Sequence, residues 1–205
     1  NLIKINKMIT YKNVFNRENF KEITSDKFFT DPESILKGFG IEQPKELAKM
    51  IKNTADKVLR NDLKRELLPA ANISTAGLLS IDIDGISTDF YLIKKITEKL
   101  ISDGRALAVQ ESVSGNLVAY FKFDCSVADY PYLYYKLWLE FTLLLGVSID
   151  FLPDLQRLRY ISLGDLYHYD DGAPVITEIL KIERLPAINT NITVRDARGI
   201  IYRSV

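Results

Sequence analysis

The 205-residue chain has few of the residues that build cysteine-based or histidine-based sites. Its one cysteine, Cys125, excludes an internal disulfide framework and a multi-cysteine zinc site, and we expect it to be a small buried or half-buried hydrophobe and not a reactive thiol. Its one histidine, His168, makes a histidine-rich metal cage hard to build, and no second histidine remains to serve beside a Ser-His-Asp triad. Both absences narrow the kinds of catalytic site that the chain can hold.

Long apolar runs and net charge are also missing. No run of about 18 apolar residues exists, so we expect no membrane-spanning segment. The first residues, Asn1-Leu2-Ile3-Lys4, lack an apolar signal core, and a cytoplasmic location is the default expectation. Lys+Arg and Asp+Glu both number 27, so no global positive field advertises nucleic-acid binding, and any such binding must come from a local patch.

What is present is enough apolar residue, 47% of the chain, to bury a sizeable core. The pattern predicts a mixed α/β (α+β) fold in three parts. Residues 1–63 form an appendage of helices and strands, residues 64–172 form the core, and residues 173–205 form a strand extension.

Several elements are predicted before the core strands begin. Strands are indicated around Met8–Phe15, and Thr30-Asp31-Pro32-Glu33 is typical of a helix start, with a capping residue before proline. Gln43–Leu67 predicts one or two amphipathic helices, whose lysines we interpret as a solvated face.

From Ala70 onward, strands and helices alternate. The helix expected over Asp89–Ser102, capped by Ser87, carries Phe90, Ile93, Ile96 and Leu100 on one side. The helix expected over Pro131–Leu145 carries an aromatic stripe, which we interpret as core and not as a base-stacking platform. The strands are expected at Ile73, Leu78–Asp84, Arg105–Glu111, Asn116–Phe123, Val147–Asp150 and Leu158–Ser162, with two more strand regions beyond Pro174 and a turn near Ala197-Arg198-Gly199.

The most informative stretch is Leu78–Gly85, where an apolar strand ends in Asp82 and Asp84. Residues two apart on a strand share a face, so the two carboxylates point the same way. Aligned anions repel, whereas a divalent metal favours them, and paired carboxylates holding Mg²⁺ or Mn²⁺ are typical of nucleotidyl and phosphoryl transfer. The alternative is a strand end whose Asp-Gly begins a turn and whose second aspartate, Asp84, caps the next helix.

Three further features accompany the aspartate pair. The turn Ser112–Asn116 offers hydroxyls and backbone N–H groups that suit phosphate oxygens. Asp150 ends another apolar run and would complete a three-aspartate site. Arg157 and Arg159 share one face of a strand, where paired guanidiniums suit a triphosphate; the alternative is ordinary salt bridging to nearby aspartates.

Together these motifs resemble the primase-polymerase domain at the front of virulence-protein-E-like helicase proteins of mobile elements, in the archaeo-eukaryotic primase superfamily. The matching stretches are Lys64–Ala70, Gly77–Asp84, Glu111–Gly115 and Ile149–Ser162, and they cover about half of the chain. The resemblance implies an RRM-like core, a metal-dependent nucleotidyltransferase, a DNA template with nucleoside triphosphates, and a helicase domain or protein as partner.

The resemblance also implies residue roles. Asp82 and Asp84 would be metal ligands, with Asp150 as the third and Asp154 as its competitor. Ser114, Gly115 and Arg157 would face the triphosphate, with Arg159 and, more weakly, Lys122 beside them.

One motif departs from the family pattern, because the superfamily places a nucleotide-contacting histidine shortly after the Ser-Gly turn. The run here is Gly115-Asn116-Leu117-Val118-Ala119, without histidine. Loss of one preorganised donor slows catalysis by about 10²–10³ elsewhere. The resemblance therefore leaves open an inactive relative that binds DNA or a helicase partner.

Overall fold

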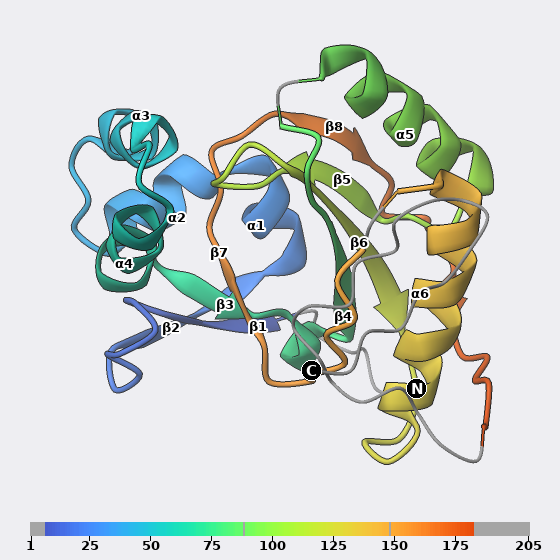
Figure 1. The fold of residues 1–205 in the computed structure, drawn as a ribbon. Helices are drawn as coiled ribbons and strands as arrows, with labels where there is room; N and C mark the ends of the chain where they lie inside the picture. The colour runs from blue at the N-terminus through green and yellow to red at the C-terminus, as the bar shows by residue number, and fades with distance from the viewer. Residues whose placement is uncertain (1–6, 88, 148, 183–205) are drawn as a thin grey trace. The chain divides into compact units, whose positions relative to one another are not determined.

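The computed structural model describes residues 7–87, 89–147 and 149–182 (Figure 1), and within them the fold mixes helices with two sheets, as expected from the sequence. The helices are α1 (Ser25–Thr30), α2 (Pro32–Gly38), α3 (Pro44–Asn53), α4 (Lys57–Leu67), the 3₁₀ helix η1 (Ile73–Ala76), α5 (Phe90–Asp103) and α6 (Tyr130–Leu145). The strands are β1 (Lys7–Tyr11), β2 (Phe20–Thr24), β3 (Ala70–Asn72), β4 (Leu78–Ile83), β5 (Ala108–Glu111), β6 (Leu117–Phe123), β7 (Leu158–Tyr160), β8 (Leu166–Tyr169) and β9 (Val175–Ile176).

The chain forms two compact units whose segments interleave in the sequence. Unit 1 takes in the described residues up to Leu78, together with Gln110–Gly115 and Gln156–Leu166. Unit 2 takes in Leu79–Val109, Asn116–Leu155 and the described residues from Tyr167 onward. Each unit is considered by itself below.

Unit 1 contains α1 to α4 and an antiparallel sheet in the order β2-β1-β3-β7. In this sheet Ala71 of β3 lies opposite Arg159 of β7. The predicted helix start at Thr30–Glu33 is confirmed, because the Asp31 side chain caps α2 and Pro32 occupies its first turn. Residues 43–67 form two helices, since Asp56 caps a new helix by accepting from the backbone N–H groups of Val58 and Leu59.

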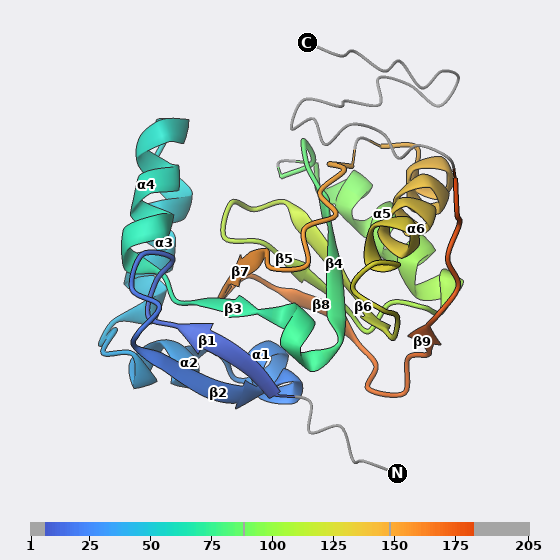
Figure 2. The same ribbon diagram turned by 90° about the horizontal axis from the view of Figure 1, so that it is seen from below.

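Unit 2 is built on a sheet in the order β4-β6-β5-β8, with β9 parallel to β6. The helices α5 and α6 lie against one face of this sheet (Figure 2). The core between them includes Ile81 and Ile83 of β4 together with Tyr134, Trp138 and Phe141 of α6, all buried. The interpretation of the aromatic stripe on α6 as core is therefore confirmed.

A network of ion pairs ties α6 to its surroundings in unit 2. Glu140 pairs with Arg105 (2.5 Å) and Lys136 (3.1 Å), and Lys136 also pairs with Glu178 (2.7 Å). Burial alone would raise the pKa of Glu140, but hydrogen bonds from Arg105 and Lys136 outweigh it, so the pKa is lowered.

Two local expectations are wrong because polar side chains compete for the backbone. Ile73 begins η1 and is not in a strand: Ser74 Oγ donates to Asn72 Oδ1 (2.7 Å) and Thr75 Oγ1 donates to the Asn72 carbonyl (2.7 Å), which favours a turn. Asp89, and not Ser87, caps α5, with its carboxylate accepting from the Leu92 N–H (2.9 Å).

Three strand expectations also need correction. The strand expected over Met8–Phe15 ends at Tyr11, and the one expected over Leu158–Ser162 ends at Tyr160. In the expected strand Val147–Asp150, the described residues 147, 149 and 150 contain an isolated bridge at Ile149 and no strand. The Ile149 carbonyl accepts a hydrogen bond from Trp138 Nε1 (2.8 Å), and so its partner is a side chain and not a neighbouring strand.

The expected C-terminal extension is only partly within the described residues. Beyond Pro174 the structure contains β9, while the other strand region and the turn near Ala197-Arg198-Gly199 lie outside the described residues.

The expected burial of Phe90 is wrong. Phe90, expected on the buried side of α5 with Ile93, Ile96 and Leu100, is 81% exposed, whereas those three are buried. Phe90 occupies the first position of the helix, where no preceding turn covers it.

Candidate functional site: carboxylates in unit 2 and cations in unit 1

Asp82 and Asp84 lie where β4 ends, in unit 2. Asp82 is half-buried within the strand, and Asp84 follows it in an exposed position. Gly85 comes next with φ of 77°, a left-handed conformation that glycine adopts without strain, so the chain turns sharply after the second carboxylate. This backbone is therefore compatible with both sequence-based interpretations: a turn at Asp84-Gly85, and a common strand face for Asp82 and Asp84.

Asn116 holds the second carboxylate in place. Its Nδ2 donates to Asp84 Oδ1 (2.7 Å), and its Oδ1 accepts from the Ile86 N–H (3.4 Å). One side chain at the start of β6 thus connects to both sides of the Asp84-Gly85 turn. No sequence pattern indicated this contact, since Asn116 was noted only as the last residue of the Ser112–Asn116 turn and for the absence of a histidine after it.

A bridge to Ile149 places the third carboxylate. Ile83 and Ile149 pair in antiparallel fashion, and both are fully buried. If the antiparallel register continued by one residue, Asp150 would lie opposite Asp82, on the face that Asp84 shares. Asp154 lies four residues further on and is exposed, so the bridge favours Asp150 as the third ligand.

The donor set suits a hard divalent cation, since Mg²⁺ and Mn²⁺ prefer carboxylate oxygens. Among the residues that the structure describes, no three His, Cys, Asp or Glu side chains form a ready-made metal-binding group. Asp82, Asp84 and Asp150 each take part in further interactions in the structure.

The Ser-Gly turn belongs to unit 1. Its backbone closes through the Gly115 N–H, which donates to the Ser112 carbonyl (2.9 Å), and Gly115 has φ of 86°. Lys64 of α4 donates from Nζ to Ser114 Oγ (3.1 Å), and the same ammonium lies 5.9 Å from the ring centre of Tyr160. The interpretation of the α3–α4 lysines as a solvated face is therefore wrong for Lys64, which is half-buried beside the turn.

Further cations lie near Tyr160. Burial raises the pKa of the Tyr160 hydroxyl, and the positive charges of Arg65 and Arg157 oppose that rise. We therefore define the cationic cluster of unit 1 as Lys64, Arg65 and Arg157. Arg159, on β7 itself, is only 8% exposed and less accessible than Arg157.

Lys122 does not lie near the carboxylates. It stands six residues after Asn116, roughly 20 Å along an extended strand. Its ammonium donates to the Asp171 carbonyl and pairs with the Asp171 carboxylate (3.6 Å). The structure thus gives Lys122 a role in holding the β8–β9 connection to β6.

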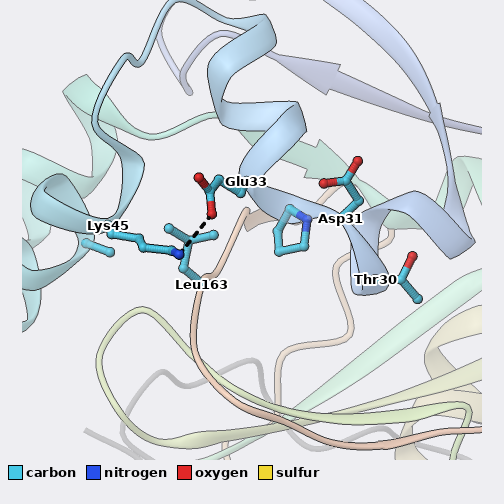
Figure 3. A pocket seen from close by; sticks show the side chains of 7 residues that line it. Thr30, Asp31, Glu33, Lys45 and Leu163 are labelled. Carbon is cyan, nitrogen blue, oxygen red and sulfur yellow. Dashed lines mark ion pairs between the residues drawn. The ribbon is translucent and has the colours of Figure 1, made fainter.

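Unit 1 also contains two pockets that no motif indicated. One, of about 510 Å³, has Lys45 and Glu33 paired across it at 3.3 Å, beside Asp31 and Leu163 (Figure 3). Hydrogen bonds from Lys37 and Lys45 lower the pKa of Glu33. The other, of about 310 Å³, lies among α3, the Ser-Gly turn and residues 161–165.

The remaining singled-out residues are structural. Cys125 is half-buried, as expected, and burial, assisted by the carboxylates of Asp129 and Asp124, raises the pKa of its thiol. His168 Nε2 lies 3.2 Å from the Ala106 carbonyl oxygen within unit 2.

Comparisons of the chain with protein-family models, curated proteins and solved structures found no match. Over residues 7–87, 89–147 and 149–182, none of the helices combines the length and apolarity needed to cross a bilayer.

Proposed function

We propose that this chain is a metal-dependent nucleotidyltransferase of the primase-polymerase type, which joins nucleotides on a DNA template. The observation that carries the proposal is the Ile83–Ile149 bridge, since an antiparallel register continued by one residue would bring Asp150 opposite Asp82, on the face shared by Asp84. Carboxylate oxygens are the ligands that Mg²⁺ and Mn²⁺ prefer, and sets of aspartates that hold such cations are typical of nucleotidyl transfer.

The topology of unit 2 supports the finer fold assignment. Its elements follow the order β4, α5, β5, β6, α6 and then Ile149, which pairs with β4. With the sheet order β4-β6-β5, and with the Ile149 bridge in the place of the last strand, this order is similar to the βαββαβ arrangement of ferredoxin-like and RRM-like domains. We therefore interpret unit 2 as an RRM-like core.

In this proposal Asp82, Asp84 and Asp150 hold Mg²⁺ or Mn²⁺. Bound there, such cations acidify a 3′-hydroxyl and stabilise charge on the α-phosphate. Asn116 orients Asp84 through its amide, as outer hydrogen-bonding partners do for metal ligands generally.

Unit 1 by itself contains groups suited to phosphate. Ser114 and Gly115 offer a hydroxyl and a tight turn, Lys64 adds positive charge beside Ser114, and the charge of Arg157 acts on the nearby Tyr160. Lys64 is an addition to the residues that the sequence suggested, and a triphosphate oxygen would replace Ser114 Oγ as its partner.

Template-directed incorporation of labelled nucleotides, with Mg²⁺ or Mn²⁺, tests the proposal. Asp82→Asn and Asp84→Asn should each abolish incorporation, while the matched variant Asp171→Asn, which removes a carboxylate elsewhere in unit 2, should retain it. Activity retained in either of the first two variants, with a native circular dichroism spectrum, would contradict the proposal.

Nucleotide binding tests unit 1 separately. Lys64→Met should weaken binding of a fluorescent nucleoside triphosphate by about tenfold, as expected for loss of one charge-assisted contact. Lys57→Met, at the exposed start of the same helix, should leave binding unchanged. Equal effects of the two substitutions would remove Lys64 from the site.

A second candidate is a catalytically inactive primase-like module that binds DNA or a helicase partner. It is favoured by the absence of a histidine in the residues after the Ser-Gly turn, where the superfamily has its nucleotide-contacting histidine. Asn116, the first of these residues, is instead hydrogen-bonded to Asp84 and Ile86. This candidate predicts DNA binding that is independent of metal, with no incorporation by the wild-type protein.

A further inference from the structure

The outward face of α5 combines two exposed aromatic rings with lysines. Phe90 is 81% exposed and Tyr91 is 76% exposed, at the start of the helix. Lys94 and Lys95 follow four residues after each ring, and both are exposed. Because residues four apart are neighbours on a helix surface, each aromatic residue has a lysine next to it on this face of α5.

The outward face of α5 is exposed because the opposite side of the helix packs against the core. Ile93, Ile96 and Leu100 face the core of unit 2, and at 100° per residue Tyr91 and Lys95 lie on the opposite side of the helix. Lys94 lies 3.9 Å from Glu98, and its side chain is well exposed. Two large aromatic side chains in solvent cost free energy unless something covers them.

The position of the two rings along the chain is also informative. A short turn connects them to the carboxylates, since the Asp89 N–H donates to the Ile86 carbonyl (3.0 Å) and Asn116 binds both Ile86 and Asp84. Phe90 is the sixth residue after Asp84, at most about 20 Å of chain away. The rings thus lie within a few nucleotides' reach of the carboxylates in the same unit.

We propose that Phe90, Tyr91, Lys94 and Lys95 form a binding surface for single-stranded DNA. Exposed aromatic rings stack on unpaired bases irrespective of sequence, and interleaved lysines attract the phosphates. Duplex DNA offers no unstacked bases to such rings, and an apolar protein partner would not select the lysines. The inference rests on the proposed function and adds to it, because it names the surface of unit 2 that contacts a single DNA strand. Binding at this surface requires neither metal nor nucleotide.

The test is fluorescence anisotropy of a short labelled oligothymidylate, without metal or nucleoside triphosphate. The Phe90→Ala/Tyr91→Ala protein should bind about tenfold or more weakly than the wild type, whereas Leu143→Ala, which truncates an exposed apolar residue on α6, should not change binding. Phe90→Trp/Tyr91→Phe should retain binding and Phe90→Leu/Tyr91→Leu should lose it, since only an aromatic ring stacks. Lys94→Gln/Lys95→Gln should reduce the salt dependence by a slope of about 1.4.

Two results would overturn the inference: no binding by the wild type, or wild-type affinity in the double alanine protein. If unchanged affinity came with a lower melting temperature of the double alanine protein, the rings would be covered by another part of the chain. Repeating the titration in Asp82→Asn/Asp84→Asn separates this surface from the metal site, because that background should bind the oligonucleotide normally.

Discussion

The hydrogen bond from Trp138 to Ile149 offers a sharp test of how Asp150 is positioned. Trp138→Phe keeps an aromatic ring in the core but removes the donor to the Ile149 carbonyl, and both residues are fully buried. A buried carbonyl left without its donor costs about 1–3 kcal/mol. The smaller ring leaves a cavity of about 40 Å³, which adds about 1 kcal/mol.

The expected loss of unfolding free energy is thus about 2–4 kcal/mol, or roughly 4–16 °C in melting temperature for a chain of this size. Urea unfolding followed by circular dichroism measures it, since Trp138 is the only tryptophan and its fluorescence is lost in the variant. The same substitution should weaken Mn²⁺ binding, because Asp150 follows Ile149 directly.

Tyr135→Phe is the matched control for this experiment. Tyr135 stacks on Trp138 with ring centres 5.9 Å apart, and the substitution removes one hydroxyl while keeping both rings. We expect a change within about 0.5 kcal/mol and unaltered Mn²⁺ affinity. If Trp138→Phe proves no more destabilising than Tyr135→Phe, the bridge does not depend on this hydrogen bond and the reasoning is refuted.

Three further predictions concern both units. Gly164→Ala should destabilise the protein by about 1–3 kcal/mol in urea unfolding, because the new Cβ would lie 2.6 Å from the Glu111 carbonyl oxygen; an unchanged midpoint would contradict this packing. The Cys125 thiol, whose pKa is raised, should react with iodoacetamide at pH 8 more slowly than a free thiol, and a faster rate would be at odds with its burial. Because the pKa of Glu140 is lowered in the folded protein, its ionised form stabilises the fold above its unfolded pKa of about 4.3, and this contribution is lost as pH falls through the lower folded pKa. Glu140→Gln should therefore make the decline in unfolding free energy below about pH 5 less steep. An equally steep decline in the variant would exclude the ion-pair network as its cause.

The elements that the sequence predicted well are those whose local pattern and final packing agree. The strand at Leu78–Ile83 and the helix at Tyr130–Leu145 have strong apolar patterns and are buried as expected. Asp31 and Pro32 marked a helix start by chemistry that acts within one turn. Ile73 was misjudged because hydrogen bonds from Ser74 and Thr75 outweigh its strand propensity.

The features that the sequence could not indicate depend on residues far apart in the chain. The strand that carries Arg159 pairs with β3, almost 90 residues earlier, in a sheet separate from that of Asp82. The contact from Lys64 to Ser114 spans 50 residues, and no local periodicity shows it. Tyr91, by contrast, lies opposite Ile93, Ile96 and Leu100 on the helix, so its exposure could have been predicted from spacing alone.

The most direct test of the central claim is a calorimetric titration of Mn²⁺ into four proteins: the wild type, Asp82→Asn/Asp84→Asn, Asp150→Asn and Asp154→Asn. We expect binding by the wild type that is lost in the double variant, is strongly weakened in Asp150→Asn and is unchanged in Asp154→Asn. Binding should also tighten when a nucleoside triphosphate is present. Equal binding by all four folded proteins, or no binding by the wild type, would contradict a divalent-metal site at these three aspartates.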